Sequence, residues 1–260
     1  MSETPQVFIK KFFDIDPEYS GKRICVSALP GIGMTGKAAL DHLINELHPK
    51  KYAEIYTTDF PSHIIIGEDG QILTPCVMIY YLKEVKNGNL ELFFVTGDTQ
   101  PNSVIGTNIL SEKIVQLLVE CGVKLIISLA ATPVISPKKN PKVYLTFSSP
   151  SLFQEFLDAG VKNKFVKGTI TGMNGVIPGI AKSYNIGGVV LLSETFPQFV
   201  RDMNASVSLI KVLNNYLGLN VDVSDLEIQA QKTIDLYDRM RKRQREKRLR
   251  KGSRDLGYIS

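Results

Sequence analysis

The chain has no tryptophan and only three cysteines and three histidines among its 260 residues. Cys25, Cys76 and Cys121 lie far apart in the sequence, and none belongs to a C-x-x-C pair. A disulfide framework needs several paired cysteines, and a structural zinc site needs clustered cysteine and histidine ligands. Neither is expected here, and we predict buried free thiols.

The histidines form no recognisable site. None of His42, His48 and His63 has a second histidine or a cysteine at the short spacing that metal ligands need. The chain also lacks a G-x-S-x-G segment, the nucleophile motif of α/β-hydrolases. We therefore expect no catalytic residues, no metal and no cofactor, and the chain is not expected to be an enzyme.

Long apolar runs are also missing, since no stretch approaches the ~20 residues that span a bilayer. The N-terminus, Met1-Ser2-Glu3-Thr4-Pro5, has neither the basic region nor the apolar region of a secretory signal. Apolar residues make up 43% of the chain, which is enough for a full core. We therefore expect a cytoplasmic globular protein without a membrane partner.

The excess of positive over negative charge is confined to one segment. Residues 239–251 contain nine Lys or Arg and one Glu, so the net charge of this segment is +8. Because the whole chain has a net charge of +5, the remaining residues together carry −3. A folded nucleic-acid-binding face needs basic residues spread over the surface with aromatic residues among them. Nucleic acid is therefore not the expected partner, although the basic segment keeps that alternative open.

A glycine-rich loop follows the first apolar run, with residues 30–37 reading P-G-I-G-M-T-G-K. Gly31, Gly33 and Gly36 match the dinucleotide-binding fingerprint, whereas Gly31, Gly36 and Lys37 match most of a P-loop. Ala38 stands where a P-loop has Ser or Thr, so the hydroxyl that ligates Mg²⁺ is missing. We therefore do not expect Lys37 to contact phosphate.

The dinucleotide interpretation wants an acidic residue about 20 positions further on to hold a ribose hydroxyl. Asp59 follows the strand candidate 53–58, and Asp98 and Glu194 also follow strand candidates, so the three carboxylates could converge on one rim. The glycines can equally serve a tight turn without a ligand. For the three carboxylates we favour roles in turns and helix caps. A nucleotide or nucleoside site at residues 31–36 stays the alternative function.

Strand and helix patterns alternate along the chain. Apolar runs predict strands at 23–29, 53–58, 76–82, 90–96, 124–130 and 188–192. Apolar residues at helical spacing predict helices at 37–47, 103–121, 151–159, 176–184, 204–217 and 224–251. This alternation is typical of an α/β protein with a mostly parallel sheet covered by helices on both faces. Asn87-Gly88-Asn89 predicts a hairpin turn, which makes the sheet mixed.

The C-terminal segment has the pattern of a projecting helix. Ser224-Asp225-Leu226-Glu227 is a capping box. An apolar seam predicts a coiled coil or packing against a neighbouring subunit, and it consists of Leu226, Ala230, Thr233, Tyr237 and Met240. Charge surrounds the helix from Arg241 onward, so this part should project into solvent until Gly252-Ser253-Arg254 ends it. We expect an α/β/α domain at 1–223, this helix at 224–251 and a flexible tail at 252–260.

Several loops together resemble one family. In order, the chain has P-G-I-G at residues 30–33, G-D-T-Q-P at 97–101, N-P-K-V-Y at 140–144, T-G-M-N-G at 171–175 and Glu194-Thr195 before a Leu-rich helix. These motifs resemble the proteasome assembly chaperone 2 (PAC2) family over residues 10–237. The resemblance implies a three-layer α/β/α domain with a topology like that of nucleoside phosphorylases, an oligomer and no established enzymatic activity. It also implies binding to proteasome α-subunits or the core particle, as a homo-oligomer or with a paralogue.

The resemblance also gives the chain end a role. In chaperone and activator partners of proteasomes, a C-terminal hydrophobic-Tyr-any tripeptide inserts between α-subunits, whereas Tyr258 here is third from the end. We expect the tail to dock through Leu256, Tyr258, Ile259 and Ser260. The basic helix would steer the encounter through Arg241, Arg245 and Arg248.

Overall fold

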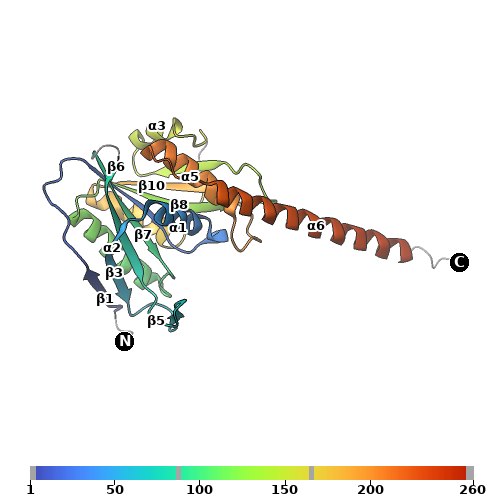
Figure 1. Ribbon diagram of the computed structural model, residues 1–260, viewed down its shortest axis with the longest axis horizontal. Coiled ribbons are helices and arrows are strands. Elements are labelled where there is room, and N and C mark those ends of the chain that lie inside the picture. The colour runs from blue at the N-terminus through green and yellow to red at the C-terminus, as the bar shows by residue number, and fades with distance from the viewer. Residues whose placement is uncertain (1–3, 86–88, 164–166, 256–260) are drawn as a thin grey trace.

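An eight-stranded sheet forms the centre of the molecule, as a computed structural model shows (Figure 1). The structure describes residues 4–85, 89–163 and 167–255, and from residue 244 onward the backbone alone. The strand order is β1-β3-β6-β7-β2-β8-β10-β9. The strands are β1 (Val7–Lys11), β2 (Lys22–Ala28), β3 (Lys50–Thr57), β6 (Val77–Val85), β7 (Leu90–Gly97), β8 (Leu125–Pro133), β9 (Val143–Phe147) and β10 (Gly187–Thr195).

Strand directions confirm a mixed sheet. The adjacent strands β7, β2, β8 and β10 pair in parallel, whereas the pairings β1–β3, β3–β6, β6–β7 and β9–β10 are antiparallel. Following these pairings, five of the eight strands point the same way. The predicted hairpin exists as β6–β7, although Asn87 and Gly88 of its turn lie outside the described residues.

Helices cover both faces and make three layers (Figure 1). One face carries α1 (Thr35–Leu47), α3 (Ser151–Leu157), α5 (Met203–Leu217) and the start of α6 (Ser224–Asp255). The other face carries α2 (Val104–Glu120) and α4 (Met173–Ala181). Short 3₁₀ helices, η1 (Ile32–Met34) and η2 (Lys182–Tyr184), precede α1 and follow α4. The predicted three-layer α/β/α class is confirmed.

The strand sequences explain why both faces are covered. In β2, Ile24 and Val26 belong to the core beneath α1 and α5, whereas Cys25 belongs to the core beneath α2 and α4. Successive side chains of a strand point to opposite faces, so a continuous apolar run needs a cover on each side. Cys25 and Cys121 are buried free thiols as predicted, whereas Cys76 is only half-buried.

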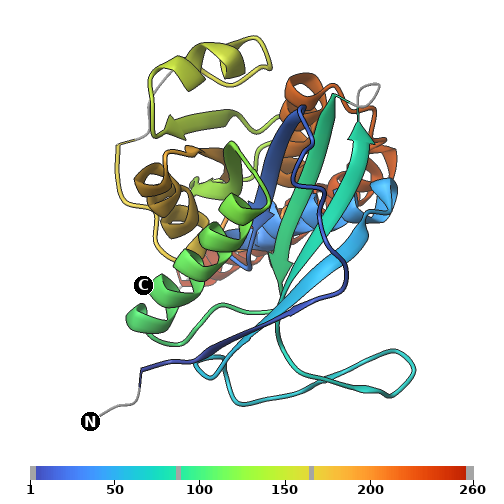
Figure 2. The same cartoon turned by 90° about the vertical axis from the view of Figure 1, so that its left-hand side faces the viewer.

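Several elements were not predicted from the sequence. β1 and β9 add the two outermost strands of the sheet. A separate two-stranded sheet, β4 (Ile65–Ile66) and β5 (Ile72–Leu73), forms an arm between β3 and β6. Figure 2 shows this arm, residues 61–75, extending away from the body. These short strands lack the long apolar runs on which the strand prediction relied.

The C-terminal helix differs from its prediction in two ways. It continues past Gly252 and ends at Asp255, four residues beyond the predicted end. The capping box is wrong, because the Ser224 hydroxyl donates to Asp222 Oδ1 at 2.7 Å and the Glu227 carboxylate accepts from Lys211 Nζ at 2.6 Å. One glycine costs a helix only about 1 kcal/mol, which the flanking residues can offset.

The predicted seam packs on the chain's own body. Leu226, Ala230 and Ile234 are buried against it, and α6 contacts α5. Met240, the last residue of the predicted seam, is 56% exposed. The prediction assumed the alternating spacings of four and three residues of a coiled coil and therefore chose Thr233. The buried residues Leu226, Ala230 and Ile234 instead follow one another at spacings of four, so Ile234 takes that place.

Candidate functional site

The glycine loop lies at the carboxyl end of β2, where open α/β sheets place ligands. Two side-chain amides from distant elements hold it in place. Asn174 of α4 accepts from the Leu29 backbone N–H at 2.8 Å and donates to the Leu29 carbonyl at 3.0 Å. Gln100 donates to the Pro30 carbonyl at 2.6 Å and accepts from the Met173 N–H at 2.8 Å. Neither pair of contacts could be predicted from local spacing, because Asn174 is 145 residues from Leu29.

Two of the three glycines have packing roles. A Cβ on Gly36 would lie 2.2 Å from the Leu129 carbonyl oxygen, so only glycine lets α1 approach β8 this closely. Gly33 has a φ of 58°, and a Cβ there would lie 2.9 Å from Thr195 Oγ1. Gly31 has no such restriction, since its Cβ would meet Asn174 at 3.5 Å. The fingerprint spacing is therefore accounted for by a tight turn and helix–sheet contact at Gly33 and Gly36.

Lys37 is engaged within its own helix. Its Nζ donates to Asp41 Oδ1 at 2.8 Å and Oδ2 at 2.9 Å, and to Thr96 Oγ1 at 3.3 Å. The side chain is 14% exposed. A phosphate would have to displace Asp41 to reach it, so the contacts support the prediction that Lys37 does not serve as a phosphate-binding lysine.

Asp59 lies too far from the glycine loop to complete a dinucleotide site. Strands β6 and β7 separate β3 from β2, which puts the two strand ends about 14 Å apart at the usual strand spacing. Asp59 Oδ2 instead accepts from the Ser103 N–H at 2.8 Å and the Ser103 hydroxyl at 2.9 Å. Ser103 in turn caps α2 by accepting from the Gly106 N–H. Asp59 therefore supports a helix start.

The other two rim carboxylates also have local partners. Asp98 Oδ2 accepts from the Cys76 N–H at 3.4 Å, and burial followed by this carboxylate raises the pKa of the Cys76 thiol to about 11. Glu194 accepts from the Tyr144 hydroxyl at 3.1 Å and the Lys142 N–H at 3.0 Å. Burial and then Glu194 raise the pKa of Tyr144. Asp59, Asp98 and Glu194 thus bond to turn, cap and neighbouring-strand groups, which agrees with the turn and capping roles that we favour for them over convergence on one rim.

A buried polar cluster lies beneath the loop, and the sequence did not indicate that its residues meet. Asp202 caps α5 by accepting from the Ala205 N–H at 3.2 Å, and its other oxygen accepts from the Phe196 N–H and the Thr195 hydroxyl, each at 3.0 Å. Thr35 Oγ1 donates to Thr195 Oγ1 at 3.1 Å. The cluster connects the starts of α1 and α5 to the end of β10, and both carboxylate oxygens of Asp202 accept hydrogen bonds within it.

A cavity of about 460 Å³ remains beside the glycine loop. It is lined by Leu29, Gly31, Ile32, Gly36, Gln100, Leu129, Ala130, Ala131, Thr132, Pro133, Thr146, Gly168, Thr169, Ile170, Thr171, Gly172, Asn174 and Leu192. Among these described residues none is charged, and Lys37, Asp59 and Asp98 are not among them. The described lining of the cavity therefore offers hydroxyl and backbone groups to a neutral ligand and supplies no cation for a phosphate.

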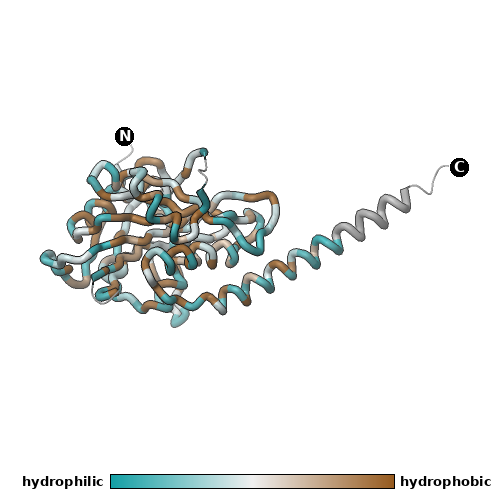
Figure 3. Tube along the Cα trace, turned by 90° about the horizontal axis from the view of Figure 1, so that it is seen from above, coloured by the Kyte–Doolittle hydropathy of each residue, from teal (hydrophilic) through white to brown (hydrophobic). Residues whose placement is uncertain are grey.

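The second candidate region is α6, which leaves the body at an aromatic cluster. The Tyr237 ring packs edge-on against Phe196 and Phe199, with centroids 5.3 and 5.7 Å apart. Beyond this cluster the helix projects clear of the body (Figures 1 and 3). Arg241 is exposed there, together with Arg239, Lys242 and Arg243.

The remaining predicted partner-binding residues are only partly covered by the structure. Arg245 and Arg248 belong to the part of α6 for which the structure describes the backbone alone. Leu256, Tyr258, Ile259 and Ser260 lie outside the described residues. Within residues 4–85, 89–163 and 167–255, no helix combines the length and apolar character needed to cross a bilayer.

Comparison with known proteins assigns the chain to a family. A model of the PAC2 family matches residues 25–240. The chain belongs to the PAC2 family. An uncharacterized protein of Methanocaldococcus jannaschii, 27% identical over 241 residues, matches 93% of this PAC2 chain and 91% of its own length.

Solved structures share the PAC2 fold over nearly the whole chain. Pyrococcus furiosus PbaB, an archaeal proteasome activator, superposes with a TM-score of 0.82 at 27% identity, covering 90% of this chain and 98% of that chain. Pyrococcus furiosus PbaA, an archaeal homolog of proteasome-assembly chaperone, superposes with a TM-score of 0.72 at 25% identity, covering 96% and 99%. The resemblance found in the loop motifs is confirmed.

Proposed function

We propose that this chain is a non-enzymatic proteasome assembly chaperone-like protein that binds proteasome α-subunits or α-rings. The observation that carries the proposal is its likeness to PbaB, an archaeal proteasome activator, over 98% of that chain. The likeness to PbaA supports the same class of partner. The local engagement of Lys37, Asp59 and Asp98 favours binding over catalysis, and no cofactor is part of the proposal. The protein would act in the cytoplasm.

The C-terminal helix suits a partner-binding role by its charge and reach. Asp255 lies about 22 Å beyond Met240 at the rise of an α-helix, so the helix itself reaches far from the body. Its exposed basic residues would attract an acidic partner surface and raise the association rate. Tyr258 and the terminal carboxylate would then dock, and this contact would set the lifetime of the complex.

The test measures association and dissociation rates on immobilised proteasome core particles or α-rings by biolayer interferometry. Deleting residues 256–260 should mainly speed dissociation, about tenfold, because an anchoring side chain contributes roughly 1.4 kcal/mol or more. Neutralising Arg241, Arg245 and Arg248 to Gln should slow association and flatten its dependence on salt. Neutralising Lys138, Lys139 and Lys142, exposed lysines of the body, removes equal charge and serves as the matched control.

The outcomes separate the alternatives. If the intact chain ignores core particles and α-rings, the proposed function fails. If the truncated chain binds as tightly as the intact one, the anchor lies elsewhere on the body. If the basic helix binds RNA or DNA with a steep salt dependence while α-rings are ignored, nucleic acid replaces the proteasome as partner.

The cavity beside the glycine loop supports one alternative, a site for a neutral nucleoside-like ligand. Its lining of hydroxyl and backbone groups is the observation in favour. A ligand present at 100 times its Kd should stabilise the fold by about 2.7 kcal/mol. A thermal-shift panel of nucleosides and nucleotides that leaves the melting temperature unchanged would remove this alternative.

We also propose that the chain works as a homo-oligomer, or with a paralogue as partner. Its family resemblance motivates this part of the proposal. Native mass measurement of the purified protein, alone and with proteasome α-subunits, gives the number of copies and the composition of the complex. A single copy at micromolar concentration, also in the presence of α-subunits, would contradict it.

A further inference from the structure

The strand β1 forms an open edge of the sheet. It is the first strand in the order, and among the described residues no strand pairs with its outer side. The backbone groups of Gln6 and Phe12 bond to the β3 side, through Thr58 N–H to the Gln6 carbonyl and Phe12 N–H to the Tyr52 carbonyl. Backbone groups alternate in direction along an antiparallel strand, so those of Val7, Ile9 and Lys11 face outward.

This edge is unusually apolar. Phe8 is 53% exposed, Ile9 40% and Phe12 45%, and the Phe8 ring stacks on Tyr56 of β3 at 6.2 Å between centroids. The base of the arm continues the apolar surface, since Tyr56 and Ile64 line one hollow. Sheet edges are normally protected by charge, proline or a covering element. We call β1 with Tyr56 and Ile64 the β1 surface.

The charges near this edge are of both signs and largely paired with each other. Lys11 Nζ lies 3.3 Å from Glu120, and Lys51 Nζ lies 2.9 Å from Glu54. The Lys10 ammonium lies over the Phe12 ring at 5.1 Å from its centroid. A second copy of the same surface would therefore meet no block of like charge, in contrast to a second copy of the basic part of α6.

We infer that β1 pairs antiparallel with β1 of a second copy around a two-fold axis at Ile9, which joins the two sheets. This inference rests on the self-association proposed above, and it adds which surface of the chain the two copies use. In this register Ile9 faces its own copy, Phe8 faces Lys10 and Val7 faces Lys11, so no lysines stand opposite each other. The outward backbone groups of Val7, Ile9 and Lys11 then form the hydrogen-bonded pairs of the new ladder. A two-fold interface of this kind uses the same patch on both subunits.

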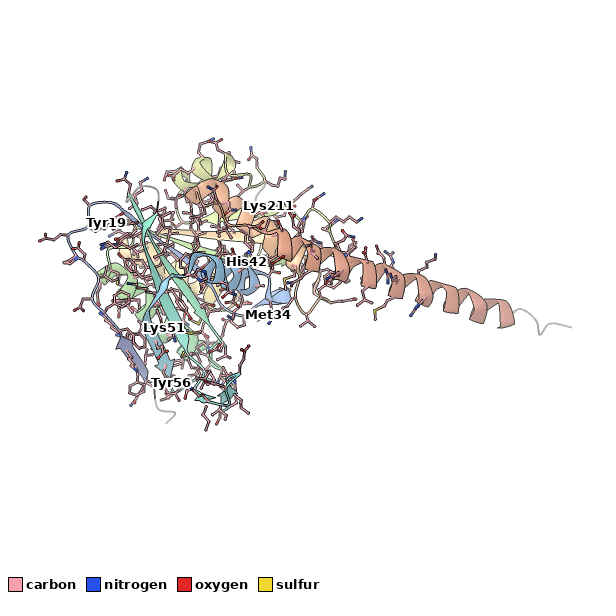
Figure 4. The ribbon with its side chains drawn as sticks, in the orientation of Figure 1. Tyr19, Met34, His42, Lys51, Tyr56 and Lys211 are labelled. Carbon is pink, nitrogen blue, oxygen red and sulfur yellow. The ribbon has the colours of Figure 1, made fainter. Side chains whose placement is uncertain are left out.

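The position of the β1 surface is compatible with the proposed partner binding. Figure 1 places β1 and the arm on the side of the molecule away from the one from which α6 projects. Figure 4 likewise shows Tyr56 on the side of the arm, and Met34 on the side of α6. Pairing through β1 therefore leaves α6 free in both copies.

The test uses charge at the two-fold axis and reads the copy number by size-exclusion chromatography with light scattering. Ile9→Lys puts two lysines opposite each other and Ile9→Glu puts two glutamates there, so each variant alone should dissociate to half the wild-type copy number, with a dimer Kd raised at least about tenfold. Mixing the two variants should restore the association, because Lys then faces Glu. Since the Ile9 side chain is already 40% exposed, both variants should melt near the wild-type temperature.

A second variant tests the backbone ladder directly. Ile9→Pro removes an outward N–H that makes no bond to β3, so the fold is kept but the new ladder loses a hydrogen bond from each copy. Ile9→Val keeps the N–H and should keep the wild-type copy number.

Three results would overturn the inference. They are an unchanged copy number in the Lys, Glu and Pro variants, a mixture of the Lys and Glu variants that stays dissociated, and a β1 edge that takes up a foreign peptide strand but not a second copy. If the copy number is unchanged in all three variants, the chain still self-associates, but through a surface other than β1. A wild type that is a single copy overturns self-association itself, whereas proteasome binding is measured separately.

Discussion

Gly36 is the residue of the glycine loop on which the packing depends most. Gly36→Ala should lower the free energy of unfolding by about 2–4 kcal/mol, because the new Cβ would lie 2.2 Å from the Leu129 carbonyl oxygen. Gly31→Ala, where the nearest atom would be 3.5 Å away, should change it by no more than about 0.5 kcal/mol. Urea denaturation of both variants checks the difference. Equal losses would mean that the loop is not held by contact with β8.

The same loop shows what the sequence can and cannot predict at this scale. The spacing of Gly31, Gly33 and Gly36 correctly predicted a strand-to-helix turn, and the missing hydroxyl at Ala38 argues against a P-loop, as does the Lys37–Asp41 contact. The dinucleotide interpretation depended on Asp59 reaching the loop. Two intervening strands prevent this, and strand order is set by pairings between distant segments that no local spacing reveals.

At the scale of elements, α6 consists of a docked part and a projecting part, and Ile234 is the last buried residue of the docked part before Tyr237. Ile234 is 4% exposed, whereas Ile228 on the same helix is 53% exposed. Ile234→Ala should destabilise the docked part by about 2–4 kcal/mol, because it leaves a cavity against the body. Ile228→Ala is the matched control and should have little effect. Hydrogen exchange of the amides of residues 226–238 measures both.

An Ile234→Ala variant whose α6 amides exchange as slowly as in the wild type would contradict this division of the helix. The sequence predicted the helix and its start because the apolar spacing is clear. It did not predict which surface the helix covers, because a seam looks the same whether it meets another subunit or its own α5. The strand β1 was missed for a related reason, since its V-F-I-K-K pattern has apolar residues on both sides and lysines at its end.

For the whole molecule, stability should fall in alkaline solution. Burial is the largest cause that raises the pKa of Tyr52, Tyr81 and Tyr216 above the ordinary value of 10.0, and burial likewise raises that of Cys25 above 9.0. The unfolded chain therefore loses these protons at a lower pH than the folded chain. These groups should therefore leave the free energy of unfolding unchanged below about pH 9. Above about pH 9 the free energy of unfolding should decrease as the pH rises.

Urea denaturation between pH 7.5 and 10.5 measures this slope. Tyr216→Phe removes one of the groups and should make the decrease shallower. Glu155→Gln should have a smaller effect of the same sign, because Glu155 is the second cause of the raised pKa of Tyr216. A slope that stays the same in Tyr216→Phe would mean that this hydroxyl ionises equally in both states.

The central position of β2 also governs how the chain can fold while it is being synthesised. β2 is hydrogen-bonded to β7 from Leu90 and to β8 from Leu125, so both of its neighbours are made long after it. The ~60 residues between β2 and β7, the first neighbour to be made, take about 3–12 s to synthesise at ordinary rates. For that interval Ile24, Cys25 and Val26, which are buried in the finished sheet, have no partner strand beside them. A protein that we propose to assist the assembly of others thus emerges from the ribosome with one of its two central strands unpaired, and such exposed apolar segments are prone to aggregate.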